Sequence, residues 1–104
     1  MPKAKFSPLN RLARSLTTEN QWLYILSLLK SGDTYAYSLK NEIEKEFGWK
    51  PGLIMSYLVL YKLEKEGLIT SRFQGRRKYY TVTEKGKQAL VSAKRYMKAL
   101  SENL

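Results

Sequence analysis

The sequence LEKEGLITSRFQGRRKYYTVTEKG, residues 63–86, decides the fold. A helical pattern ends in it at Gly67, and the apolar residues that follow alternate instead of recurring every three or four positions. Residues 68–73 and 78–83 therefore predict two strands, and residues 74–77, which include a glycine, predict the turn between them. Three cations would occupy the tip of this β-hairpin: Arg76, Arg77 and Lys78.

Apolar residues recur at helical spacing in four segments before the hairpin, from about residue 8 to 16, 18 to 31, 34 to 47 and 53 to 66. Ser7 and Pro8 indicate the start of the first helix, because serine caps free amides and proline suits the first helical position. Thr18 and Gln21 have the spacing of a capping box at the second helix. Gly32 is expected to end that helix in a left-handed conformation. The fold class is thus mainly α with a small β-hairpin.

Thr83 can cap a last helix, which would run from residue 84 to about residue 103. Its apolar residues alternate by three and four, as in a heptad seam: Leu90, Ala93, Met97, Leu100 and Leu104. A single domain could bury this seam on itself, but a narrow stripe on a terminal helix is also typical of dimerisation, and we expect a homodimer. The 104 residues then form one domain: a basic N-terminal helix or arm (1–16), a core (17–83) and a C-terminal dimerisation helix (84–104).

The charge is large and uneven. Nineteen lysines and arginines against nine acids give a net charge of +10. Residues 17–49 carry a net charge of −2, whereas residues 1–16, 50–83 and 84–104 carry +4, +5 and +3. This asymmetry predicts an electropositive face that attracts nucleic acid, an anionic membrane surface or an acidic protein. No apolar run is long enough to cross a bilayer and no signal-peptide pattern is present, so we expect a cytoplasmic protein.

Several kinds of chemistry are excluded by composition. Cysteine and histidine are both absent, which excludes disulfides, thiolate chemistry, histidine-ligated metals and imidazole catalysis. No paired carboxylates, nucleophile–base set or phosphate-binding glycine loop is present. We therefore expect neither an enzyme nor a metal nor a cofactor.

Three helices followed by a two-stranded hairpin is the order of a winged helix-turn-helix, in which the third core helix enters the major groove of DNA and the hairpin is the wing. Lys50 and the amides near Gly52 would meet a phosphate at the start of this helix. The residues expected to read bases from it are Ser56, Tyr57, Tyr61 and Lys62. The wing residues expected to contact phosphates or the minor groove are Arg72, Gln74, Arg76, Arg77 and Lys78.

Residues 53–63 are unusually apolar for a helix that reads bases. Tyr57 and Tyr61 could instead pack in the core or at a dimer interface, and sequence preference could rest on the wing and on DNA shape. Two alternatives to a sequence-specific regulator therefore stay open: a non-specific architectural nucleic-acid-binding protein, and a module that binds an acidic protein.

Four motifs carry a resemblance to a known family: YILSLL (24–29), LYKLEKEGLI (60–69), RKYY (77–80) and TEKG (83–86). With their spacing they make residues 22–83 resemble the PadR family of transcriptional regulators. The resemblance implies a homodimeric winged-helix DNA-binding repressor that is associated with the nucleoid when bound to DNA. It also implies that the C-terminal helix is the dimer interface.

Two stretches depart from that family. YAY (35–37) stands where the family usually has His-Gly-Tyr, and MSYL (55–58) keeps only the tyrosine of the usual start of the recognition helix. Some relatives bind phenolic or drug-like molecules between their dimer helices, where Trp22 and Trp49 could stack on a flat ligand. A core or interface role is favoured for both tryptophans, and nothing in the sequence indicates a dedicated effector pocket.

Overall fold

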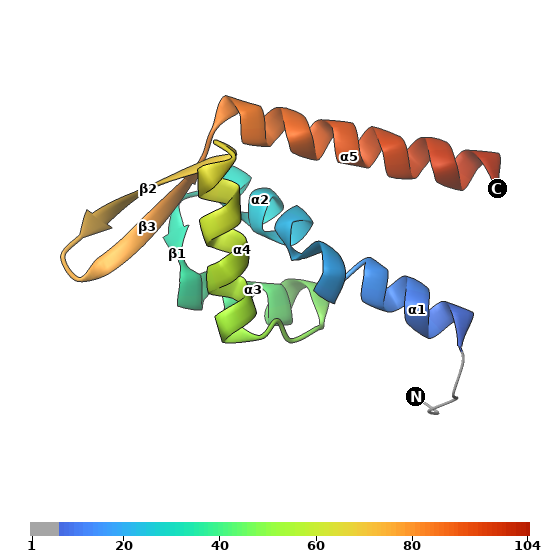
Figure 1. The fold of residues 1–104 in the computed structure, drawn as a ribbon, viewed down its shortest axis with the longest axis horizontal. Helices are drawn as coiled ribbons and strands as arrows, with labels where there is room; N and C mark the ends of the chain where they lie inside the picture. Colours follow the sequence, from blue (N-terminus) through green and yellow to red (C-terminus); the bar gives the residue numbers. More distant parts are fainter. Residues whose placement is uncertain (1–6) are drawn as a thin grey trace.

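The computed structural model describes residues 7–104, so Lys3 and Lys5 of the basic N-terminal segment lie outside the described residues. The helices and strands, shown in Figure 1, are α1 (Pro8–Ser15), the 3₁₀ turn η1 (Thr18–Asn20), α2 (Gln21–Ser31), β1 (Thr34–Tyr35), α3 (Ala36–Phe47), α4 (Leu53–Lys65), β2 (Ile69–Gln74), β3 (Arg77–Val82) and α5 (Glu84–Asn103). The prediction of a mainly helical chain with a hairpin before the last helix is confirmed. The described part of residues 1–16 is largely helical.

Helices α2, α3 and α4 pack around one apolar core. Its largest fully buried side chains are Ile25, Leu26, Ile43, Leu60 and Ile69. Trp22 and Trp49 are partly buried and pack against the same cluster, as the core interpretation of both predicts. The burial of these side chains fixes α4 against α2 and α3, because apolar area removed from water is the main favourable term in folding.

One polar contact lies between α2 and α4 inside this core. Gln21 and Ser56 are each 3% exposed, and the Gln21 side-chain amide donates to the Ser56 hydroxyl at 2.6 Å. The Ser56 hydroxyl in turn donates to the carbonyl of Gly52 at 2.8 Å. Two predictions are therefore wrong. Gln21 points inward and forms no capping box with Thr18, which begins a 3₁₀ turn instead. Ser56 is occupied and buried, so it cannot reach a base.

The sheet has three strands in the order β1-β3-β2, all antiparallel. The hairpin of β2 and β3 lies within one residue of its predicted bounds. The prediction that Thr34 begins a helix is wrong, because Thr34 and Tyr35 are extended and pair with Tyr80 and Tyr79 of β3. This short strand covers the inner edge of β3, whose backbone groups would otherwise lack partners.

Three helix ends test the capping predictions. The Ser7 side chain accepts from the amide of Asn10, and the Thr83 side chain accepts from the amide of Gly86, so both predicted caps are confirmed. Gly32 does end α2, but with φ 161° and ψ 155°. That backbone is extended, and the prediction of a left-handed Gly32 is wrong. The chain leaves α2 directly into the extended residues that form β1.

The longest helix, α5, has 20 residues and extends away from the body of the molecule (Figure 1). Leu90, near its start, is 5% exposed and belongs to the core of its own chain. The prediction that Leu90 lies in a dimer seam is therefore wrong, because the first half of α5 packs on the domain. Farther along, Met97, Leu100 and Leu104 are 36%, 49% and 96% exposed. In the described part of the chain, no helix combines the length and apolar character that a membrane span requires.

Gly86 allows α5 to pack closely against the segment between α4 and β2. A Cβ at this position would lie 2.1 Å from the carbonyl oxygen of Leu68 and 2.8 Å from a methyl carbon of Val82. The same carbonyl accepts a hydrogen bond from the amide of Thr83 at 3.1 Å, so the backbone there is held in place. Only glycine fits this contact without a shift of the helix.

We predict that Gly86→Ala destabilises the protein by about 1–3 kcal/mol, because the added methyl overpacks a fixed backbone. An alanine in a helix is otherwise favourable by roughly 1 kcal/mol, so a loss of stability would report the clash alone. Thermal or urea unfolding measures the change. Gly52→Ala is the control, since the nearest atom to a Cβ there lies at 4.0 Å. A Gly86→Ala variant as stable as the parent would contradict the close docking of α5.

Candidate nucleic-acid interface

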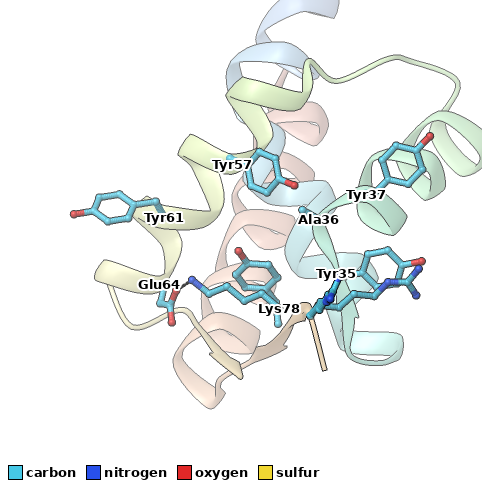
Figure 2. A pocket seen from close by; sticks show the side chains of 10 residues that line it. Tyr35, Ala36, Tyr37, Tyr57, Tyr61, Glu64 and Lys78 are labelled. Atoms are coloured by element: carbon cyan, nitrogen blue, oxygen red, sulfur yellow. Dashed lines mark ion pairs between the residues drawn. The ribbon is translucent and has the colours of Figure 1, made fainter. Parts of the chain in front are cut away.

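A groove of about 400 Å³ opens between α4, the hairpin and the start of α3 (Figure 2). Five tyrosines and three cations line it, together with an alanine and one acid. The lining residues are Tyr35, Ala36, Tyr37, Tyr57, Tyr61, Glu64, Arg76, Arg77, Lys78 and Tyr80. Aromatic rings beside cations form a surface that suits an anionic partner with planar groups.

Helix α4 contributes two of these tyrosines. Tyr57 and Tyr61 are 52% and 63% exposed, so the alternative that they pack in the core is wrong. Lys62 is exposed as well, but it lines a different hollow, with Met55 and Val59, beside α2. The structure thus brings Tyr57 and Tyr61 together with the wing and separates Lys62 from them.

The start of α4 combines a cation with uncapped amides. Gly52 is the N-cap residue, and no side chain bonds to the first amides of the helix. Lys50 lies two residues earlier with a side chain that is 76% exposed, and its nitrogen is 3.9 Å from a carboxylate oxygen of Glu44. The partial positive charge of a helix N-terminus and a neighbouring lysine both favour an anion at this place.

The tip of the hairpin is a tight turn. Gln74 pairs with Arg77, which leaves Gly75 and Arg76 as the two turn residues. Of these two turn residues, Gly75 alone has a positive φ, 65°, as in a type II′ hairpin turn. The Arg77 guanidinium lies 4.4 Å from the centre of the Tyr35 ring, whereas Arg76 takes part in no ion pair within residues 7–104.

Two carboxylates of the helical body hold the other wing cations. Glu64 of α4 lies 3.7 Å from the Lys78 nitrogen (Figure 2). Glu64 also accepts a hydrogen bond from the Ser71 hydroxyl. Arg72 follows Ser71 in β2, and successive side chains of a strand point to opposite faces. The Arg72 side chain therefore lies on the face of the hairpin opposite to Ser71 and Glu64. Its guanidinium donates to Asp33, in the loop before β1, at 2.8 Å. Arg72 therefore stays outside the groove, and both carboxylates fix the angle of the wing.

Asp33 is the centre of a small network on that outer face. The Thr81 hydroxyl donates to Asp33 at 2.8 Å, and Arg72 donates both to Asp33 and, at 3.1 Å, to Thr81. The hydrogen bond from Thr81 lowers the pKa of Asp33, partial burial opposes this shift, and Arg72 adds to it through a hydrogen bond and its charge. The charged form of Asp33 is thus favoured in the folded protein.

We predict that Asp33→Asn loosens the wing and lowers the melting temperature at pH 7 only slightly, because the pair is largely exposed. Because the pKa of Asp33 is lower in the folded state than the unfolded value of 3.8, its contribution is present above that pH and is lost as the pH falls through the folded pKa. The difference between parent and variant should therefore disappear in acid. Thermal unfolding from pH 7 to about pH 2 tests this, with Glu46→Gln as a control on an exposed face. An equal difference at every pH would contradict the network.

The residues of this region that sequence reasoning missed include Tyr35, Tyr37, Asp33 and Glu64. The available signal for the two tyrosines was the YAY stretch, which places an aromatic residue on each side of the alanine that begins α3. No sequence signal joins Asp33 to Arg72, since the two are 39 residues apart and meet only through the sheet.

Comparisons with known proteins agree with this architecture. A solved transcriptional regulator from Clostridium thermocellum is 27% identical, with a TM-score of 0.74 over 78% of this chain and 85% of that one. A PadR family transcription regulator from Clostridium difficile is 25% identical, with a TM-score of 0.72 over 78% and 90%. Bacillus subtilis PadR, solved in complex with operator DNA, is 35% identical with a TM-score of 0.63 over 69% of this chain and 44% of that one. No curated protein sequence matches the chain.

The helices and the wing thus define a winged-helix transcriptional regulator. The model of the PadR-like family of transcriptional regulators matches residues 25–92, and the chain belongs to that family.

Proposed function

We propose that the protein is a homodimeric repressor that binds a specific sequence of double-stranded DNA in the cytoplasm and carries no catalytic activity. The observation that carries this proposal is the groove in which exposed tyrosines of α4 face the cations of the wing. A relative that is 35% identical over 69% of this chain, Bacillus subtilis PadR, was solved in complex with operator DNA, which supports the same partner here.

The geometry suggests how the duplex is held. Helix α4 enters the major groove, which is about 12 Å wide and admits an α-helix. Lys50 and the amides near Gly52 bind a phosphate at the entry of the helix. The wing tip reaches the adjacent backbone or minor groove with Gln74, Arg76 and Arg77, and Lys78 joins them if it leaves Glu64. Arg72 stays with Asp33 and holds the wing, so we assign it a positioning role.

We predict that Arg76→Ala and Arg77→Ala each weaken DNA binding and reduce its salt dependence. For every phosphate that a variant no longer neutralises, the slope of log K against log salt concentration should become shallower by about 0.9. Fluorescence anisotropy between about 50 and 200 mM salt measures both quantities. Arg95→Ala on α5 removes the same charge from a surface away from the groove and serves as the control. An unchanged slope in both wing variants would count against contacts from the wing.

The second copy is expected along the outer half of α5. Ala93, Met97, Leu100 and Leu104 continue the seam beyond Leu90 and remain partly or fully exposed. A hollow of about 570 Å³ lies beside Ala93 and Met97 and is lined mainly by apolar side chains. Pairing of two α5 helices would remove this surface from water and relate two DNA-binding grooves by a two-fold axis.

We predict that Met97→Glu and Leu100→Glu convert the dimer to a monomer that is still folded. Both side chains are exposed in the single chain, so a charge there does not disturb its core. A charged substitution of Leu90 would be uninformative, since it would unfold the domain. Sedimentation measures the mass, and circular dichroism checks the fold. Variants that stay dimeric would show that the two copies meet elsewhere.

A non-specific architectural protein is the alternative, because the net charge of +10 attracts any duplex. Selection of bound sequences from a random pool of duplex DNA separates the two functions. Recovery of a palindromic motif supports the proposed dimeric regulator. Recovery of no motif, with equal affinity for all duplexes, would favour the architectural alternative.

A further inference from the structure

The outward stripe of α4 is apolar where a base-reading helix normally carries hydrogen-bonding side chains. Ile54, Leu58 and Tyr61 are spaced four and three residues apart and so share one face of the helix. They are 88%, 45% and 63% exposed. Such a row of large apolar side chains costs free energy in water, and single exposed residues need no explanation whereas a contiguous row does.

The charges around the stripe indicate what covers it. Lys50 lies before the first turn of α4, and Lys65 continues the stripe at its end, both exposed. The cations of the wing lie across the groove from Tyr57 and Tyr61. An apolar strip with positive charges on several sides is complementary to a partner surface that has anions along its edges. The floor of a DNA groove between two phosphate backbones has this property, and an uncharged protein surface does not.

Base pairs present one apolar group to the major groove, the 5-methyl group of thymine. The side chains that read guanine, adenine or cytosine by hydrogen bonds are Arg, Lys, Asn, Gln, Asp and Glu. None of these occurs in residues 53–61, and Ser56 is buried against Gln21. The exposed side chains in the first turns of α4 can therefore contact methyl groups, and few of them can form hydrogen bonds with base edges.

We propose that Ile54 and Leu58 recognise thymine by packing on its 5-methyl group, so that the preferred DNA site carries thymines under the first two turns of α4. This inference rests on the proposed function, since it requires α4 to lie in the major groove. The Tyr57 and Tyr61 hydroxyls remain available to phosphates or base edges at the border of the stripe.

The test replaces each thymine of the selected DNA site, one at a time, by deoxyuridine. This removes the methyl group and leaves the Watson–Crick pairing and every hydrogen-bonding group in place. At each thymine that faces α4, removal of the methyl group should reduce the affinity about fourfold. The full-length protein is used throughout, with anisotropy at one fixed salt concentration.

Protein variants assign the effect to a side chain. Ile54→Ala and Leu58→Ala should bind the thymine site more weakly and should no longer distinguish thymine from uracil at the position that each contacts. Val91→Ala on α5, also an exposed apolar residue, should keep the full discrimination. Loss of stability is not expected in the Ile54 variant, because that side chain is 88% exposed.

The outcomes are separable. A selected motif whose affinity is indifferent to every uracil substitution overturns the methyl readout and leaves the proposed regulator intact. Discrimination that persists in both alanine variants overturns the assignment to Ile54 and Leu58. A change of mass in sedimentation on Ile54→Ala would show that a second copy covers the stripe, which also overturns the inference. If no motif is recovered at all, the proposed function itself fails and the readout fails with it.

Discussion

The placement of the interface depends on the central position of β3 in the sheet. The two middle residues of this strand, Tyr79 and Tyr80, are paired on both sides, with β1 and with β2, and its inner end buries Tyr80 and Val82 in the helical core. Its outer half pairs only with β2 and carries Arg77 and Lys78 into solvent. Because the inner end of β3 is buried in the core and its outer end is exposed, the strand holds the tip of the wing at a defined distance from α4. The close approach of Gly86 to the Leu68 carbonyl and to Val82 holds α5 against the inner end of the hairpin.

The acids at the base of the wing act on geometry more than on stability. Asp33 and Glu64 each hold one wing cation, and both pairs are substantially exposed. Exposed ion pairs contribute little to folding free energy, since water screens them. They nevertheless restrict where Arg72 and Lys78 point and offset the positive charge of these two side chains. The strongest positive charge is therefore left at the turn, where the chain would meet a phosphate backbone.

Local chemistry made the order of the elements predictable from sequence. The starts at Ser7 and Thr83 and the hairpin turn at Gly75 follow from interactions within a few residues, which a sequence displays directly. The tip cations likewise follow from the turn, because the residues of a tight hairpin loop lie at the surface.

The rest depended on contacts between distant residues. Helix α4 is apolar on several faces, so its pattern does not reveal that Ser56 points inward to Gln21 while Tyr57 points outward. Leu90 has the spacing of a dimer seam and also of a helix that packs on its own domain, and only the docking of α5 decides between them. The two residues of β1 are too few for any alternation to show, and they are strand only because β3 offers an edge. Asp33 and Arg72 meet through that same edge.

The different proposed roles of the wing and of α4 explain why a single copy of the chain would be insufficient for sequence-specific DNA binding. In the proposed complex, phosphate contacts from Arg76 and Arg77 would raise the affinity for every duplex and would carry no sequence information. Discrimination in the major groove would then come from α4, where each apolar contact with a methyl group distinguishes bases by only about fourfold. A genome offers on the order of a million or more competing sites, which a few such contacts do not outweigh. Two copies joined along α5, as proposed, would read two half-sites at once, and their discrimination ratios would multiply. For a helix as apolar as α4, the proposed pairing through the exposed half of α5 would therefore be required for specificity.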